Sequence, residues 1–407
     1  MKAIVAAMVV LVACAPGEGR PLDVAQLGDL VPRRLIAPRE DEAPRATFVP
    51  LQHTQAVPSD AVLHERPRPH RAKSREYWFA ADASELSTGV ELPTTAEGAI
   101  VRLQPLDLET RAAAGIDPTS LVLVDATGSE HGAIESMAVL ASADELRDAD
   151  VGLAPGTTAF ALAPALGHGA FVLRTDVAPM APRYLVHVHE KRSEVALAVK
   201  ADRDAVLWGD TVTIDVALDE DVAELVSAQG SVRGPFGAEH ELKLAKHGDA
   251  LRGTFVIDDD RPPQGALWTI EIDARVRTDD GLLARRSGRT AIGYAVPSAG
   301  FVGELHIEEG SRGGLDITLP LEIAARGRYG VGAVLWGKDA RGVARPVALA
   351  QSAAWLEAGS DALVLTFDEA ALAQSAASPP YELRDLRLVD QGRLAVLHRQ
   401  AFAGSLD

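Results

Sequence analysis

The chain has 407 residues, of which 47% are hydrophobic and 24% charged, so it is long enough for several globular domains with proper cores. Its formal net charge of −18 disfavours nucleic acids and anionic lipid surfaces as partners, because both would be repelled. A single cysteine excludes an internal disulfide and a zinc site built from several thiolates. Because the negative surface repels anionic lipid head groups, any membrane attachment must be covalent.

The first 13 residues consist of Met-Lys and the apolar run AIVAAMVVLVA, which is typical of a secretion signal and too short to span a bilayer. The run ends in Leu11-Val12-Ala13-Cys14, which resembles the bacterial lipobox. The resemblance implies cleavage before Cys14, lipidation of this cysteine and, because Ala15 follows it, an outer-membrane lipoprotein that faces the periplasm or the surface. The alternative is a chance cysteine in a plain secretion signal, with a secreted product.

Residues 14–74 are rich in Pro and Arg and show little hydrophobic periodicity, which indicates a tether that is extended or lies along its neighbours. Its histidines, His53, His64 and His70, are interpreted as solvated linker residues.

Short apolar runs bounded by Gly, Pro or Asp follow in residues 75–182, and they predict a mainly β N-terminal domain. The segment SADELRDAD predicts one or two helical turns capped by Ser142.

Period-two alternation is clearest in residues 183–297, where TVTIDVAL and WTIEIDARVR each place apolar side chains on one face. This pattern predicts antiparallel strands with one buried face, and their number is typical of an immunoglobulin-like sandwich.

Residues 298–407 repeat the alternation and predict a second sandwich, with a short helix from Asp368. The predicted fold class is therefore all-β, with tandem immunoglobulin-like antiparallel β-sandwiches and minor helix.

Two segments carry a family resemblance. REYWFAADASELSTGVELPTTAEGAIVRLQPLD (residues 75–107) resembles the N-terminal domain of an exported bacterial family, domain-of-unknown-function family 4785. The segment from GRYGVGAVLWG to YELRDLRLVD (residues 327–390) is similar to a module appended to secreted proteases and cell-surface proteins. The resemblance implies an N-terminal domain, an immunoglobulin-like middle domain, a β-rich C-terminal domain and export. It implies no activity.

Catalytic motifs are missing from the sequence. G-x-S-x-G, H-E-x-x-H and a P-loop are absent, and GRYGVG has neither the third glycine at the spacing G-x-G-x-x-G nor the following helix of a dinucleotide fingerprint. We therefore expect no enzymatic activity.

One pair of residues has the spacing of metal ligands. In YLVHVHEK, His187 and His189 share a strand face, so their imidazoles could chelate a zinc ion. A solvated strand face is the simpler interpretation, because zinc usually needs at least three protein ligands.

Three acidic turns, DED (219–221), IDDD (257–260) and TDDG (278–281), could hold calcium, although Asp and Gly are also what tight turns require. No other cofactor is expected.

Tryptophans could form a sugar-stacking platform. Trp268 alternates in register with Ile270 and Ile272, which predicts core packing, and Trp208 before a Gly-Asp turn is the better binding candidate. Trp336 and Trp355 belong to the same set without a stronger signal.

The sequence therefore predicts a non-enzymatic lipoprotein whose β-sandwich scaffold binds a protein or glycan of the cell envelope. The alternatives are a secreted effector and a metal-dependent hydrolase that uses His187 and His189.

Overall fold

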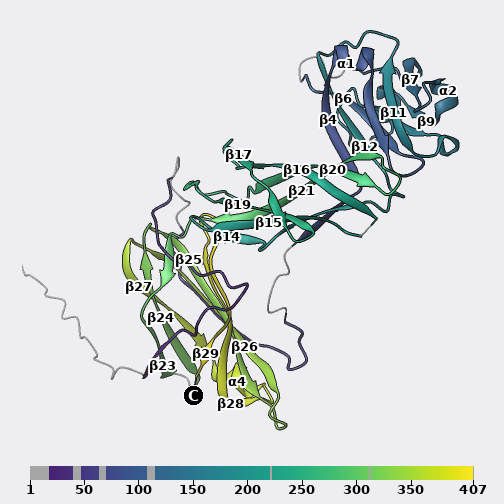
Figure 1. Ribbon diagram of the computed structural model, residues 1–407. Coiled ribbons are helices and arrows are strands. Elements are labelled where there is room, and N and C mark those ends of the chain that lie inside the picture. Colours follow the sequence, from purple (N-terminus) through teal and green to yellow (C-terminus); the bar gives the residue numbers. More distant parts are fainter. Residues whose placement is uncertain are drawn as a thin grey trace, which may run out of the picture.

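The computed structural model describes residues 18–39, 47–63, 70–107, 115–220, 222–310 and 313–406. Figure 1 shows three domains in a row, with the middle domain between the N-terminal and the C-terminal ones. Nearly all regular elements are strands that pair antiparallel, which confirms the predicted all-β, multi-domain sandwich class. None of the helices in the described ranges has the length and apolar character needed to cross a membrane.

The N-terminal domain packs one face of a long sheet against a smaller sheet. The long sheet contributes β4 (Glu76–Asp82), β6 (Ile100–Pro105), β9 (Met137–Ala141), β10 (Thr158–Leu162) and β12 (Arg183–His189). The smaller sheet has the order β5 (Val90–Thr94), β11 (Gly169–Thr175), β7 (Leu121–Val124) and β8 (Glu130–Gly132). The short helices are α1 (Ala83–Thr88), α2 (Ala133–Ser136), α3 (Ala143–Asp148) and the 3₁₀ turns Pro118–Ser120 and Pro164–Leu166. Ser142 caps α3 through a capping box with Glu145, as the sequence predicts.

The middle domain continues the same long sheet. Its strands there are β16 (Ala223–Arg233), β17 (Glu239–Leu242), β20 (Trp268–Thr278), β21 (Leu283–Ala295) and β14 (Ala205–Leu207), which pairs parallel to β21. The facing sheet contains β3 (Arg71–Ser74), β13 (Leu197–Ala201), β15 (Thr211–Leu218), β18 (Ala245–His247) and β19 (Ala250–Val256). Because β21 also pairs with β4, one sheet of ten strands runs through both domains.

The C-terminal domain is a sandwich of two five-stranded sheets. One sheet contains β1 (Glu18–Pro21), β22 (Ala299–Phe301), β23 (Glu304–Glu309), β24 (Leu315–Ile323) and β27 (Gly359–Phe367). The other has the order β2 (Leu51–Ala56), β26 (Ala344–Leu356), β25 (Gly327–Lys338), β28 (Ser378–Asp390) and β29 (Ala395–Ser405). The helix α4 (Glu369–Ala373) begins after Asp368, where the sequence predicts it.

Two boundaries differ from those that the sequence predicts. The strand β12, which we expected to begin the middle domain at residue 183, pairs with β4 and β6 and buries Tyr184, Val186 and Val188 in the N-terminal core. The described part of the predicted tether (14–74) is partly folded, because β1 and β2 join the C-terminal sheets and β3 joins the middle domain. In Figure 1 this purple segment runs along the C-terminal domain before the chain reaches the N-terminal one.

Candidate functional site

The two histidines predicted as metal ligands lie on the outer face of β12, beside Glu76 of β4. The Nε2 atom of His187 is 2.8 Å from Glu76 Oε2, and His189 Nδ1 is 3.7 Å from the same oxygen. The hydrogen bond from His187 lowers the pKa of the Glu76 carboxyl, against the opposing effect of its partial burial. The result is a His–Glu hydrogen bond on an outer sheet face.

Metal binding gains no support from this geometry. Among the residues that the structure describes, no group of three or more His, Cys, Asp and Glu could hold a metal ion. In the predicted calcium turns, Asp219 contacts Lys73 and Arg71 at 2.7 and 2.9 Å, and Asp259 contacts Arg261 at 2.7 Å. In the third turn, Thr278 donates a hydrogen bond to Asp280. The turn residue Asp221 lies outside the described residues.

The predicted binding residue Trp208 is half-buried. Its indole Nε1 donates to the Asp258 carbonyl oxygen at 3.3 Å, and the Arg34 guanidinium lies 5.9 Å from the ring centroid. Trp268 is fully buried in the middle core, as its register predicts. The predicted lipidation residue, Cys14, lies outside the described residues, as does His64.

One aromatic residue that the sequence reasoning missed is Trp78, on the outer face of β4 beside His187. Their ring centroids are 6.3 Å apart, and the Arg289 guanidinium lies 5.5 Å from the indole centroid. The alternation of β4 against the buried Tyr77 could have placed Trp78 on the outer face.

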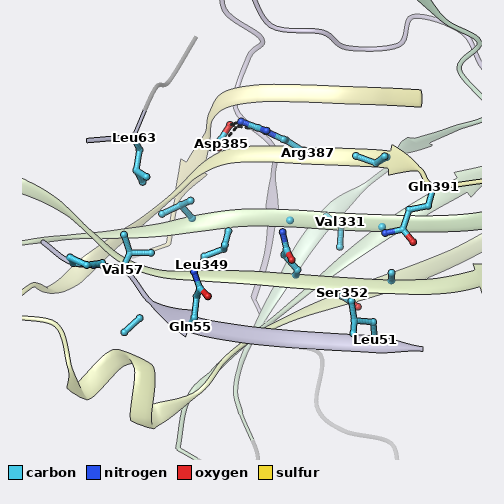
Figure 2. A pocket seen from close by; sticks show the side chains of 18 residues that line it. Leu51, Gln55, Val57, Leu63, Val331, Leu349, Ser352, Asp385, Arg387 and Gln391 are labelled. Carbon is cyan, nitrogen blue, oxygen red and sulfur yellow. Dashed lines mark hydrogen bonds and ion pairs between the residues drawn. The ribbon is translucent and has the colours of Figure 1, made fainter. Parts of the chain in front are cut away.

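A groove of about 530 Å³ crosses the outer face of the C-terminal domain's second sheet. Figure 2 shows its lining residues on β2, β26, β25 and β28, with Leu63 above the sheet. The segment after β2 forms one wall, and its backbone stays tied to β26 because Val57 N donates to the Val347 carbonyl at 2.9 Å. The predicted tether therefore supplies part of this site.

Two glycines hollow the centre of the groove. In β25, Tyr329, Val331, Ala333 and Leu335 face the core, so Gly330 and Gly332 occupy outward positions. A Cβ atom at Gly330 would lie 2.8 Å from Gln391 Nε2, whereas one at Gly332 would meet Gln351 Cγ at 3.4 Å, which is ordinary contact. The segment GRYGVG, which does not match a nucleotide fingerprint, thus leaves two successive outward positions of β25 without side chains.

The groove combines an aliphatic floor with amide groups on its sides. Val334, Leu349 and Val389 supply apolar surface, and the amides come from Gln55, Gln351 and Gln391. On β28, Arg387 forms a bidentate ion pair with Asp385 at 2.9–3.0 Å, drawn as dashed lines in Figure 2. None of the described lining residues is aromatic. Such a surface can bury short aliphatic groups and hydrogen-bond a polar backbone.

Comparison with known proteins matches two parts of the chain to models of one family. Residues 43–190 match the N-terminal domain, and residues 298–405 the C-terminal domain, of a family described as a domain of unknown function (DUF4785). The N-terminal match ends directly after β12, in agreement with the pairing of that strand. No curated protein matches the chain.

A solved structure has the same overall arrangement. The crystal structure of a DUF4785 family protein from Legionella pneumophila is 25% identical to this chain, with a TM-score of 0.73. The similarity covers 92% of this chain and 98% of that protein. The two family matches and this similarity along nearly the whole length agree with each other, and the chain belongs to the DUF4785 family.

Proposed function

We propose that this protein is a non-enzymatic binding protein whose C-terminal groove holds an extended polypeptide segment of a partner protein. The groove itself is the observation that carries the proposal, because a concave sheet face with an apolar floor and amide sides suits a peptide backbone with small aliphatic side chains. Its glycine-lined centre leaves room for a chain to lie directly on the sheet.

A polypeptide is favoured over a glycan by the chemistry of the lining residues. Aromatic faces are the usual platform for sugar rings, and the described lining offers none. The amides of Gln55 and Gln351 can each donate to a backbone carbonyl and accept from a backbone N–H, which matches the alternating groups of an extended chain.

The groove proposal is tested with peptides selected from a random library displayed on phage. The variant Gly332→Val fills the groove at a position where the backbone tolerates a Cβ atom. We expect selected peptides to bind this variant at least about tenfold more weakly than the wild type, equivalent to ~1.4 kcal/mol. Fluorescence anisotropy measures the affinities.

The matched control is Ala291→Val, which adds a valine at an exposed position of β21 in the middle domain. It should bind the selected peptides as the wild type does, and both variants should melt near the wild-type temperature. Equal affinity of Gly332→Val and wild type for every selected peptide would contradict the proposal.

The proposal includes export and a lipid anchor at Cys14, with the protein at the outer membrane. The sequence of the first 14 residues supports it, since a short apolar run ends at the only cysteine of the chain. Labelled palmitate should enter the wild type and not Cys14→Ala, and that variant should move from the membrane to the soluble fraction. Unlabelled wild-type protein in the culture medium would favour the secreted effector instead.

A hydrolase screen with and without divalent metals distinguishes the proposed binding function from the alternative, a metal-dependent hydrolase that uses His187 and His189. We expect no turnover in either case. An activity that metal raises and that His187→Ala removes would replace the binding proposal.

A further inference from the structure

Within the described ranges, two arginines lie side by side on the long sheet without an ion pair to a carboxylate. Arg275 of β20 and Arg285 of β21 are direct partners in the antiparallel register. Within the described ranges, neither side chain makes a hydrogen bond or an ion pair. Like charges opposite each other destabilise a sheet, so this pair needs an explanation.

Because Arg285 is partly buried, the lack of a counter-charge reduces the stability of the folded protein. Its guanidinium lies 4.7 Å from the ring centroid of Phe79, which belongs to the N-terminal domain, and its Nε atom is buried without a hydrogen-bond partner. Burial lowers the pKa of the Arg285 guanidinium, and the charge of Arg275 lowers it further. A buried donor without an acceptor loses the hydration that it has in the unfolded chain.

Neighbouring arginines on the same sheet are paired. Arg289 has an ion pair with Glu271, and Arg277 has one with Glu224 at 3.3 Å. The carboxylates of Glu91 and Asp273 act on Arg285 through their charge without reaching ion-pair distance, and Asp273 accepts a hydrogen bond from Ser287 at 2.6 Å. Among the described residues, Arg275 and Arg285 therefore lie next to each other on this sheet without an ion-pair partner.

We propose that Arg275 and Arg285 form a binding site for a small oxyanion, a carboxylate or phosphate group, at the junction of the N-terminal and middle domains. Two adjacent guanidinium groups offer the paired donors that such groups accept in bidentate fashion. The strongly negative protein repels large polyanions, so the ligand is a small molecule rather than a nucleic acid. The site is separate from the C-terminal groove and does not depend on it.

The test measures melting temperature at constant ionic strength, with chloride as the reference and inorganic phosphate or succinate as probes. At saturation, at least one probe should raise the melting temperature of the wild type by about 2–4 °C. The variant Arg275→Gln should lose this rise. In chloride alone it should melt at or above the wild-type temperature, because the repulsion is removed.

The control is Arg277→Gln, two residues along the same strand, which should keep the full response. A rise with phosphate alone assigns the site to phosphate compounds, and a rise with succinate alone assigns it to carboxylates. No rise in the wild type with either probe, or the same rise in Arg275→Gln, would overturn the proposal.

Discussion

At the scale of single residues, the junction between the N-terminal and middle domains contains a fully buried ion pair. Arg286 and Glu190 are both fully buried, with Arg286 Nη2 3.0 Å from Glu190 Oε2. The guanidinium also donates to the Val195 carbonyl at 2.8 Å and to Ser193 Oγ at 2.8 Å, while Thr95 N donates to Glu190 at 2.9 Å. Every member of this network is satisfied, which a buried charge pair requires.

Replacing Arg286 alone should therefore strongly destabilise the protein. Arg286→Met leaves the Glu190 carboxylate buried without its counter-ion, and we expect a loss of about 3–5 kcal/mol in the free energy of unfolding. Urea denaturation measures the loss. The double variant Arg286→Met with Glu190→Gln should recover part of it, because no unpaired charge remains. A loss below about 1 kcal/mol in the single variant would show that the ion pair contributes little.

His398 of β29 predicts a dependence of stability on pH. Burial beside Phe301 lowers its pKa to about 4, although the hydrogen bond with Gln400 acts in the opposite direction. The unfolded chain takes up the proton near pH 6.5, so stability is full above that pH and is lost as pH falls towards 4. The total effect is about 3 kcal/mol.

The measurement compares unfolding of wild type and His398→Leu at pH 7.5, 6.5 and about 5, where most carboxylates stay ionised. The wild type should lose stability over this range, and the variant should lose less. Identical pH profiles for the two proteins would refute the assignment to His398.

At the residue scale, only some of the polar residues of the candidate sites could be predicted from the sequence. The alternation of YLVHVH placed His187 and His189 on an outer face, which the structure confirms. It gave no sign of Glu76, because that residue reaches His187 through strand pairing across more than 100 positions. The burial of Arg286 could not be predicted for the same reason, since its distant acceptors come from two other segments of the chain, Thr95 and residues 190–195.

At the scale of elements, strands were predictable and their partners were not. The faces of β15 and β20 follow the alternation, with Val212, Ile214 and Val216 buried in one and Trp268 to Val276 at every second position in the other. Alternation indicates a buried face without indicating which sheet covers it. For this reason the sequence places β12 in the middle domain, whereas its apolar side chains pack in the N-terminal core. The groove could not be predicted for the same reason, because its walls come from β2 and β28, which lie far apart in the sequence.

Strands β1 and β2 cover sheet edges of the C-terminal domain. Pairing of β1 with β23 and of β2 with β26 satisfies backbone groups that would otherwise be open to other chains. Removal of residues 18–57 should therefore expose two strand edges and cause self-association. Size-exclusion chromatography with light scattering should show dimers or larger species, while the chain from residue 18 is the control. A truncated chain that stays monomeric at the same concentration would disprove the protective role.

At the scale of the whole molecule, the order of domains along the sequence corresponds to their order in space (Figure 1). Length and composition indicate several domains, and the alternation of apolar residues indicates that they are β-rich. The return of the N-terminal segment to the far domain could not be predicted. The bridge between Leu30 and Arg399 and the pairing of β1 with β23 join residues that are hundreds of positions apart, in a segment without hydrophobic periodicity. Such docking depends on open edges elsewhere in the fold, which a local pattern does not report.

The shared sheet predicts how the molecule unfolds. The N-terminal and middle domains share one sheet of ten strands and the buried Arg286–Glu190 pair, whereas the described core of the C-terminal domain includes only Leu207 and Ala295 from the middle domain. Calorimetry of the full chain should therefore show two transitions, one for the first two domains together and one for the C-terminal domain.

The variant Arg286→Met tests this assignment, because it weakens only the junction of the first two domains. It should lower the temperature of their joint transition or split it, and leave the C-terminal transition within about 1 °C of the wild type. Three separate transitions in the wild type would mean that the continuous sheet does not couple the domains. A shift of the C-terminal transition in Arg286→Met would mean that the coupling extends through all three domains.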